Sequence, residues 1–136
     1  MTSEDRAIER LERARERVET SPSGALKLLP AGRDLPAPLR AERGFIAAEA
    51  FRAMGFFREA ERLYRRVLAR TRSDEDPPLW VESALGSAAG LRCLGAVAEA
   101  RRRLACARAA ARASRLSVYG DRLALEEALV ERAAER

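Results

Sequence analysis

The feature that most constrains the fold is a pattern of small, apolar and glycine residues that occurs twice, 40 residues apart. Each copy has a small residue, a large apolar residue, a glycine, an apolar residue, an alanine and two more apolar residues, at identical spacings. The copies are Ala48, Phe51, Gly55, Phe57, Ala60, Tyr64 and Val67, and Ala88, Leu91, Gly95, Val97, Ala100, Leu104 and Ala107. Self-similarity at a period of about 20 to 50 residues is typical of repeat proteins, whose units bury each other's apolar faces. The pattern therefore favours a protein that holds a partner over one that catalyses a reaction.

Apolar residues recur at helical spacing through most of the chain, and no long run rich in Val, Ile and Thr indicates a strand. We expect an all-α fold with helices over residues 3–19, 25–29, 38–54, 57–71, 79–94, 96–114 and 121–134. Thr2 or Ser3 is expected to cap the first helix, and Asp76 the fifth. Gly55 and Gly95 are expected to end the third and fifth helices, because glycine tolerates the left-handed conformation found there.

Four stretches are expected to interrupt the helices, and one of them is a short polar loop over residues 72–78. Residues 20–24 combine Ser, Pro and Gly, and residues 119–121 contain a glycine suited to a turn. Residues 30–38 hold three prolines and a glycine, so they form either a loop between units or a hinge. The sequence leaves open whether residues 1–35 pack on the rest of the chain or move independently.

Each unit of helix, glycine turn and helix resembles a tetratricopeptide repeat. In the better match, residues 38–72, Ala48 stands at the small residue of the first helix and Gly55 at the turn glycine. Ala60 and Tyr64 stand at the alanine and the aromatic residue of the second helix. Residues 78–114 match with the corresponding residues of the second copy.

The resemblance has three departures. Val67 stands where the family usually has alanine, Arg72 and Arg112 stand where proline is usual, and the period is 40 rather than about 34 residues. The resemblance implies antiparallel helical hairpins stacked as a short right-handed solenoid, in one domain over residues 1–136. Residues 1–35 would be an atypical N-terminal hairpin, and residues 121–135 a helix that closes the stack.

The resemblance also implies a concave groove lined by the first helix of each unit. The candidate groove residues are Glu42, Phe45, Glu49, Arg52, Leu85 and Arg92, and the last helix would add Arg122, Leu125 and Leu129. Phe45 and Leu85 would form an apolar floor, while Arg52 and Arg92 would hold charged groups of an extended peptide or a partner helix. The alternative is a mixed, solvated face that binds nothing.

Basic residues suggest a second kind of partner. The net charge is +5, and of the 26 basic residues all but Lys27 are arginine. The second helices of the two units carry a candidate band for a polyanion such as nucleic acid, at Arg65, Arg66, Arg101, Arg102, Arg103 and Arg108. No acidic residue lies between Ala100 and Tyr119 to neutralise it. The alternative is compositional, because a GC-rich genome gives helical proteins arginine in place of lysine.

Catalysis and metal binding are disfavoured by the residue types present. Histidine, the commonest general base and metal ligand, is absent. No glycine-rich phosphate loop occurs. Cys93 and Cys106 form no CxxC pair, and their expected positions put them beyond disulfide reach, so we expect free thiols in a reducing compartment. We expect no metal, no cofactor and no enzymatic activity.

The remaining expectations concern location and partners. The N-terminal residues are polar and no uncharged apolar run approaches 18 residues, so we expect neither a secretory signal nor a membrane span. A cytoplasmic adaptor or scaffold that binds another protein is the favoured function. The alternatives are an arginine-rich polyanion binder and a self-associating subunit, a homo-oligomer closed by the last helix or the groove.

Overall fold

The computed structural model describes residues 1–136, apart from the side chain of Asp34. This described part contains seven α-helices, two short 3-10 helices and no β-strand, which confirms the predicted all-α fold. The helices are α1 (Ser3–Arg17), α2 (Pro22–Leu28), η1 (Gly32–Asp34), α3 (Ala37–Ala53), α4 (Phe57–Arg70), α5 (Pro77–Cys93), α6 (Val97–Ala113), η2 (Ser117–Tyr119) and α7 (Gly120–Ala134). Each predicted helix is present, with ends that differ by at most three residues.

The helices begin at residues that satisfy their first backbone N–H groups. Thr2 and Asp5 form a capping box at α1, in which each side chain accepts a hydrogen bond from the other residue's backbone N–H. The Asp76 carboxylate accepts from the backbone N–H of Leu79, at 3.3 Å, at the start of α5. The predicted break at residues 20–24 is wrong for residues 22–24, which belong to α2. Pro22 is the first residue of α2, a position at which its missing N–H costs no helical hydrogen bond.

The helices α3 and α5 end in the same hydrogen-bonded turn. The N–H of Gly55 donates to the carbonyl of Arg52, and the N–H of Phe56 donates to that of Phe51, each at 2.9 Å. This pair of bonds is the Schellman motif, which needs a residue of positive φ after the helix. Gly55 supplies it with φ of 83°, and Gly95 does the same with φ of 82°. Both predicted glycine turns are therefore confirmed.

A third turn of the same kind ends α6, and it lacks glycine. Arg115 has φ of 55°, and its N–H donates to Arg112 at 3.2 Å, while the N–H of Leu116 donates to Ala111 at 2.8 Å. The turn predicted at residues 119–121 is wrong, because the chain reverses at Arg115 and Gly120 already begins α7. Propensity alone did not find this turn, since arginine is unfavourable in the left-handed region.

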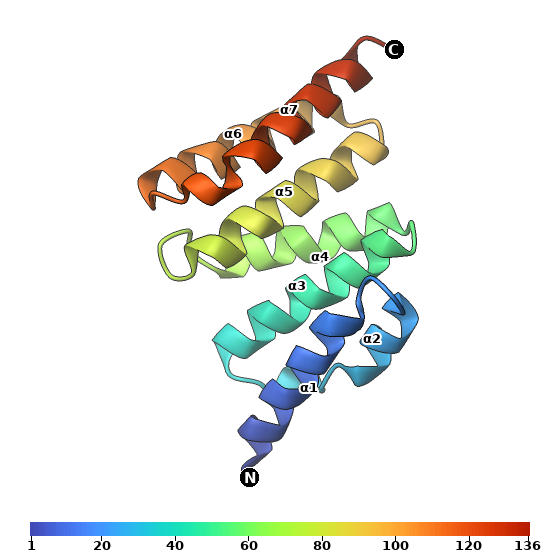
Figure 1. Cartoon of the computed structure of the whole chain (residues 1–136), viewed down its shortest axis with the longest axis vertical. Coiled ribbons are helices and arrows are strands. Elements are labelled where there is room, and N and C mark those ends of the chain that lie inside the picture. The colour runs from blue at the N-terminus through green and yellow to red at the C-terminus, as the bar shows by residue number, and fades with distance from the viewer.

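Each helix packs on the next one along the chain (Figure 1). In addition, α1 contacts α3, α3 contacts α5 and α5 contacts α7, so the odd-numbered helices also touch one another in order. Figure 1 shows α1 at one end of the molecule and α6 and α7 at the other. The first and last helices are therefore joined only through the helices between them.

The N-terminal helices α1 and α2 pack on α3, which answers a question that the sequence left open. Leu11 and Ala14 of α1, Ala25 of α2 and Ile46 of α3 are buried in one cluster. Polar contacts add to it, because the Arg10 side chain donates to the carbonyl of Leu28 at 2.9 Å. The proline-rich stretch after α2 therefore connects packed helices. It includes η1, and α3 begins at Ala37, inside the stretch predicted over residues 30–38.

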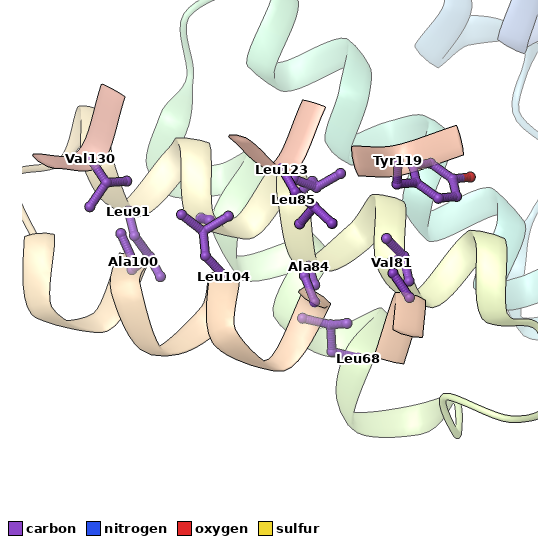
Figure 2. Close-up of a cluster of buried hydrophobic side chains, with 13 residues drawn as sticks. Leu68, Val81, Ala84, Leu85, Leu91, Ala100, Leu104, Tyr119, Leu123 and Val130 are labelled. Carbon is purple, nitrogen blue, oxygen red and sulfur yellow. The ribbon is translucent and has the colours of Figure 1, made fainter. Parts of the chain in front are cut away.

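The helix α5 is the centre of the fold. Its residues from Ser83 to Leu91 are all buried, and the largest cluster of buried side chains joins α5 to α6, α7 and Leu68 of α4 (Figure 2). Leu123 of α7 is only 2% exposed in this cluster. Burying a leucine side chain contributes about 1.5–3 kcal/mol, so α7 is held firmly against α5 and α6.

Small residues of α5 let α4 approach it closely. Tyr64 of α4 is fully buried, and its ring lies against the backbone of Gly86, where a Cβ atom would overlap the ring. Gly90 lies one turn further, and a Cβ there would come within 3.3 Å of the Cβ of Glu61. The two glycines, which sequence patterning marked only as helical, are therefore positions of close helix contact.

Candidate binding face

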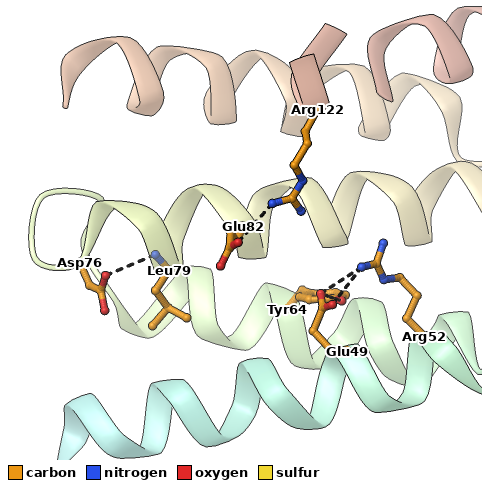
Figure 3. A network of polar contacts seen from close by, with 7 residues as sticks. All are labelled: Glu49, Arg52, Tyr64, Asp76, Leu79, Glu82 and Arg122. Carbon is orange, nitrogen blue, oxygen red and sulfur yellow. Dashed lines mark hydrogen bonds and ion pairs between the residues drawn. The ribbon is translucent and has the colours of Figure 1, made fainter. Parts of the chain in front are cut away.

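Polar side chains join the odd-numbered helices along one face, which we call the inner face. On it, Arg122 of α7 donates to Glu82 of α5 at 3.2 Å (Figure 3). Arg92 of α5 pairs with Glu126 of α7 at 2.6 Å. At the other end, Arg15 of α1 pairs with Glu42 of α3 at 2.8 Å. The face is thus made of α1, α3, α5 and α7, which lie far apart in the sequence.

Tyr64 crosses from α4 to reach the inner face. Its hydroxyl donates to the carboxylate of Glu49 on α3, and Arg52 donates to the same carboxylate at 3.0 Å (Figure 3). The Arg52 guanidinium also lies over the Tyr64 ring, 6.0 Å from its centroid. Burial raises the pKa of Tyr64 well above its ordinary value, and the charge of Glu49 raises it further. Tyr64 therefore stays protonated and holds Glu49 in place.

The two ion pairs between α5 and α7 differ in exposure. The side chains of Arg92 and Glu126 are 25% and 12% exposed, whereas those of Arg122 and Glu82 are 52% and 34% exposed. Arg122 also lies 5.6 Å from the centroid of the Tyr119 ring, over its face. Arg92 is accordingly a fixed part of the α5–α7 contact, while Arg122 is the more accessible cation.

A shallow depression of about 120 Å³ opens on the inner face between α3, α5 and α7. Its lining combines apolar residues with charges of both signs, from Arg52, Leu85, Gly86, Arg122, Leu125 and Glu126. Leu125 is 62% exposed and is the lining residue that presents apolar surface to solvent here. The depression is the place on the inner face where an apolar group and a charged group of a partner can be held together.

The predicted groove residues lie on this face but differ in their surroundings. Arg52 and Leu85 line the depression. Leu85 is only 5% exposed, so most of the exposed apolar surface of the depression comes from Leu125. Phe45 is half-buried and packs edge-on against Tyr64, with 6.1 Å between ring centroids. The other three predicted residues, Glu42, Glu49 and Arg92, are engaged in the ion pairs described above.

The predicted arginine band is partly neutralised by α7. Arg101 pairs with Glu131 at 2.6 Å, and Arg108 donates to Glu127 at 3.0 Å. The Arg108 guanidinium beside Glu127 holds the pKa of that carboxyl below its usual range. The expectation that nothing neutralises the α6 arginines is therefore wrong. Their partners are not on α6 itself but lie 19 to 30 residues further along the chain.

The other predicted band residues have different surroundings. Arg65 approaches Glu61 of its own helix at 3.7 Å. Arg66, Arg102 and Arg103 form no ion pair with any side chain that the structure describes. Arg102 is exposed on α6, whereas Arg66 lies at the edge of a separate pocket between α3 and α4. The predicted band is thus not one continuous surface of unpaired cations.

Glu126 and Gly86 are the lining residues that sequence reasoning missed. The signal for Gly86 is a glycine inside a helical pattern, where it costs about 1 kcal/mol relative to alanine and so points to a packing reason. Glu126 gave no local signal, because its partner Arg92 belongs to a helix 34 residues earlier.

Several other features bear on the chemistry of the chain. Within the described residues, no group of three or more His, Cys, Asp or Glu side chains is placed to hold a metal ion. Cys93 and Cys106 are exposed thiols. Over the same described part of the chain, no helix combines the length and the apolar character needed to cross a membrane.

Comparison with protein-family models, curated proteins and solved structures finds no match to this chain.

Proposed function

We propose that the chain is a tetratricopeptide-like helical-repeat protein that binds another protein, as an adaptor or a scaffold subunit, without catalysing a reaction. The packing supports this fold assignment. Each even-numbered helix contacts the odd-numbered helices on either side of it, and the odd-numbered helices contact one another. Stacked hairpins of a right-handed solenoid bury their apolar faces by contacts of this order, and α7 covers the end as a closing helix.

The observation that carries the proposed function is the exposed Leu125 in the depression of the inner face. Arg52, Arg122 and Glu126 surround it, contributed by α3 and α7. Protein interfaces commonly have an apolar centre and a polar, solvent-accessible rim. The depression therefore suits a partner helix or extended peptide that places one apolar side chain against Leu125.

The charged rim adds specificity because its side chains are already held in place. Tyr64 and Glu49 fix Arg52, and Arg92 fixes Glu126. Binding a partner then costs less side-chain entropy on this chain than it would if the rim side chains were mobile. Arg122 is the more accessible charge on the rim, so the favoured partner carries a carboxylate near it.

The test is affinity capture from a lysate of the cells that express the protein, with nuclease treatment and at low and high salt. Leu125→Arg places a charge on the apolar centre and should abolish capture of a discrete partner. The matched control is Ala124→Arg, which adds the same charge at an exposed neighbouring position of α7 and should leave capture intact.

Other outcomes would change the proposal. Equal capture by both variants would show that the inner face does not bind the partner. Capture that disappears after nuclease treatment would favour the polyanion-binding alternative, and recovery of the same chain alone would favour self-association. Cytoplasmic location stays a prediction of the sequence.

A further inference from the structure

A second pocket lies between the N-terminal half of α3 and the C-terminal half of α4, away from the depression of the inner face. It has a volume of about 220 Å³, and four of its lining residues are arginines: Arg40, Arg43, Arg66 and Arg70. Its remaining lining residues are small or apolar: Gly32, Ala37, Ala41, Gly44, Leu63 and Val67. None of the described side chains that line it is acidic.

Two of the four guanidinium groups are held by backbone carbonyls of the loop before α3. Arg43 donates through Nε to the carbonyl of Pro30 at 2.6 Å, and Arg40 donates to the carbonyl of Leu35 at 2.9 Å. Gly32 makes room for Arg43, since a Cβ there would lie 3.3 Å from the Arg43 Cδ. Each guanidinium has five N–H donors, so these bonds position the group and leave most donors available.

The other two arginines approach from α4. Arg66 and Arg70 are four residues apart and therefore lie on one side of the helix. Both are exposed, and neither forms an ion pair with a side chain that the structure describes. Four cations around one pocket repel one another, and this repulsion is relieved when an anion binds among them.

The short second helix explains why the pocket exists. The helix α2 has 7 residues, whereas α4 and α6, which occupy the corresponding place in their hairpins, have 14 and 17. The loop with η1 replaces the missing half of α2 beside the start of α3. A loop fills less space than a helix with side chains, so the α3–α4 hairpin remains open at that end.

We propose that this pocket binds a small phosphate monoester, with its phosphate among the four arginines and its carbon part on the floor formed by Ala41, Leu63 and Val67. Guanidinium groups match phosphate geometry with paired hydrogen bonds. A phosphate monoester carries a charge of about −1.5 to −2 at neutral pH, so it suits four cations better than a single carboxylate does. The pocket is smaller than the roughly 300–1,000 Å³ of drug-sized sites, which favours a compact ligand.

The probe is phenyl phosphate, titrated into the full chain and followed by calorimetry and by amide chemical shifts. We expect saturable binding that weakens with salt, with shifts at residues 40–44 and 63–70. Arg66→Ala and Arg70→Ala should each weaken binding by about tenfold or more, since each removes charge-assisted hydrogen bonds. Arg102→Ala is the matched control, because it removes an exposed arginine of α6 outside the pocket and should change affinity less than twofold.

Two further binding measurements distinguish the contribution of the phosphate contact from that of the apolar contact. Ala41→Leu fills the floor, so it should weaken phenyl phosphate but not inorganic phosphate. Benzoate, which has one charge, should bind at least tenfold more weakly than phenyl phosphate. The proposal is overturned if phenyl phosphate gives no saturable binding, if Arg102→Ala weakens binding as much as Arg66→Ala, or if a single-stranded oligonucleotide binds more tightly than phenyl phosphate at the same residues. Circular dichroism verifies that each variant keeps its helices.

Discussion

Helix propensity and core packing predict opposite effects of the substitution Gly86→Ala on the stability of the protein. Gly86 lies inside α5, and alanine is favoured over glycine in a helix interior by about 1 kcal/mol. Propensity alone therefore predicts a more stable protein. Packing predicts the opposite, because a Cβ at this position would lie 2.5 Å from Cε1 and 2.8 Å from Cε2 of the Tyr64 ring.

The packing cost exceeds the gain from propensity. Phe45 packs against the Tyr64 ring, and Glu49 accepts its hydroxyl hydrogen bond, so the ring cannot move without losing contacts. Overpacking a core costs about 1–3 kcal/mol, and loss of a hydrogen bond to a charged group costs about 1.5–3 kcal/mol. After the propensity gain is subtracted, we expect Gly86→Ala to lower the free energy of unfolding by about 3 kcal/mol, or Tm by roughly 10 °C.

Urea unfolding followed by circular dichroism measures this difference. Gly120→Ala is the control, because no atom lies within 4 Å of a Cβ at Gly120 in the first turn of α7. It should leave stability unchanged or raise it by up to about 1 kcal/mol. Replacement of Tyr64 by leucine in the Gly86→Ala background should recover part of the loss, which would show coupling between the two sites. A Gly86→Ala protein as stable as the wild type would refute the close approach of α4 and α5.

Two further predictions concern the helix ends and Tyr64. Gly55→Ala and Gly95→Ala should each lower the free energy of unfolding by about 1–2 kcal/mol, because a positive φ disfavours residues with a Cβ. For the same reason, Arg115→Gly should raise the free energy of unfolding by about 0.5 kcal/mol. Thermal unfolding of the three variants checks the opposite signs. Burial and then Glu49 raise the folded-state pKa of Tyr64 above its unfolded value of about 10. Its contribution to stability is thus complete below about pH 10 and is lost as the pH rises further, so Tyr64→Phe should show a smaller loss of stability between about pH 9 and pH 11 in urea unfolding.

Much of the fold could be predicted because its signals are local. Helical periodicity located all seven α-helices, and glycine marked two of the three Schellman turns. The misses arise at residues whose type does not mark the conformation they adopt. Arg115 has a positive φ that arginine does not favour, so no residue preference indicates this turn. Pro22 appeared to break a helix, but as the first helical residue it instead begins one.

The candidate site was harder to predict because its contacts join distant parts of the sequence. The predicted groove residues do lie on the odd-numbered helices. Arg92 of the groove and Arg101 of the arginine band, however, are paired with Glu126 and Glu131, residues that no spacing rule connects to them. Burial depends on contacts between distant helices in the same way. Leu85 is buried in a cluster with Leu123 of α7, whereas Leu125 of α7 is 62% exposed.

If the inner face functions as proposed, Leu125 contacts a partner protein. The most direct measurement is photo-crosslinking in living cells with a benzophenone amino acid placed at position 125 or, as a control, at position 124. We expect one discrete crosslinked protein from position 125 and none from position 124. Crosslinks of equal yield from both positions, or none from position 125, would show that Leu125 does not contact a partner.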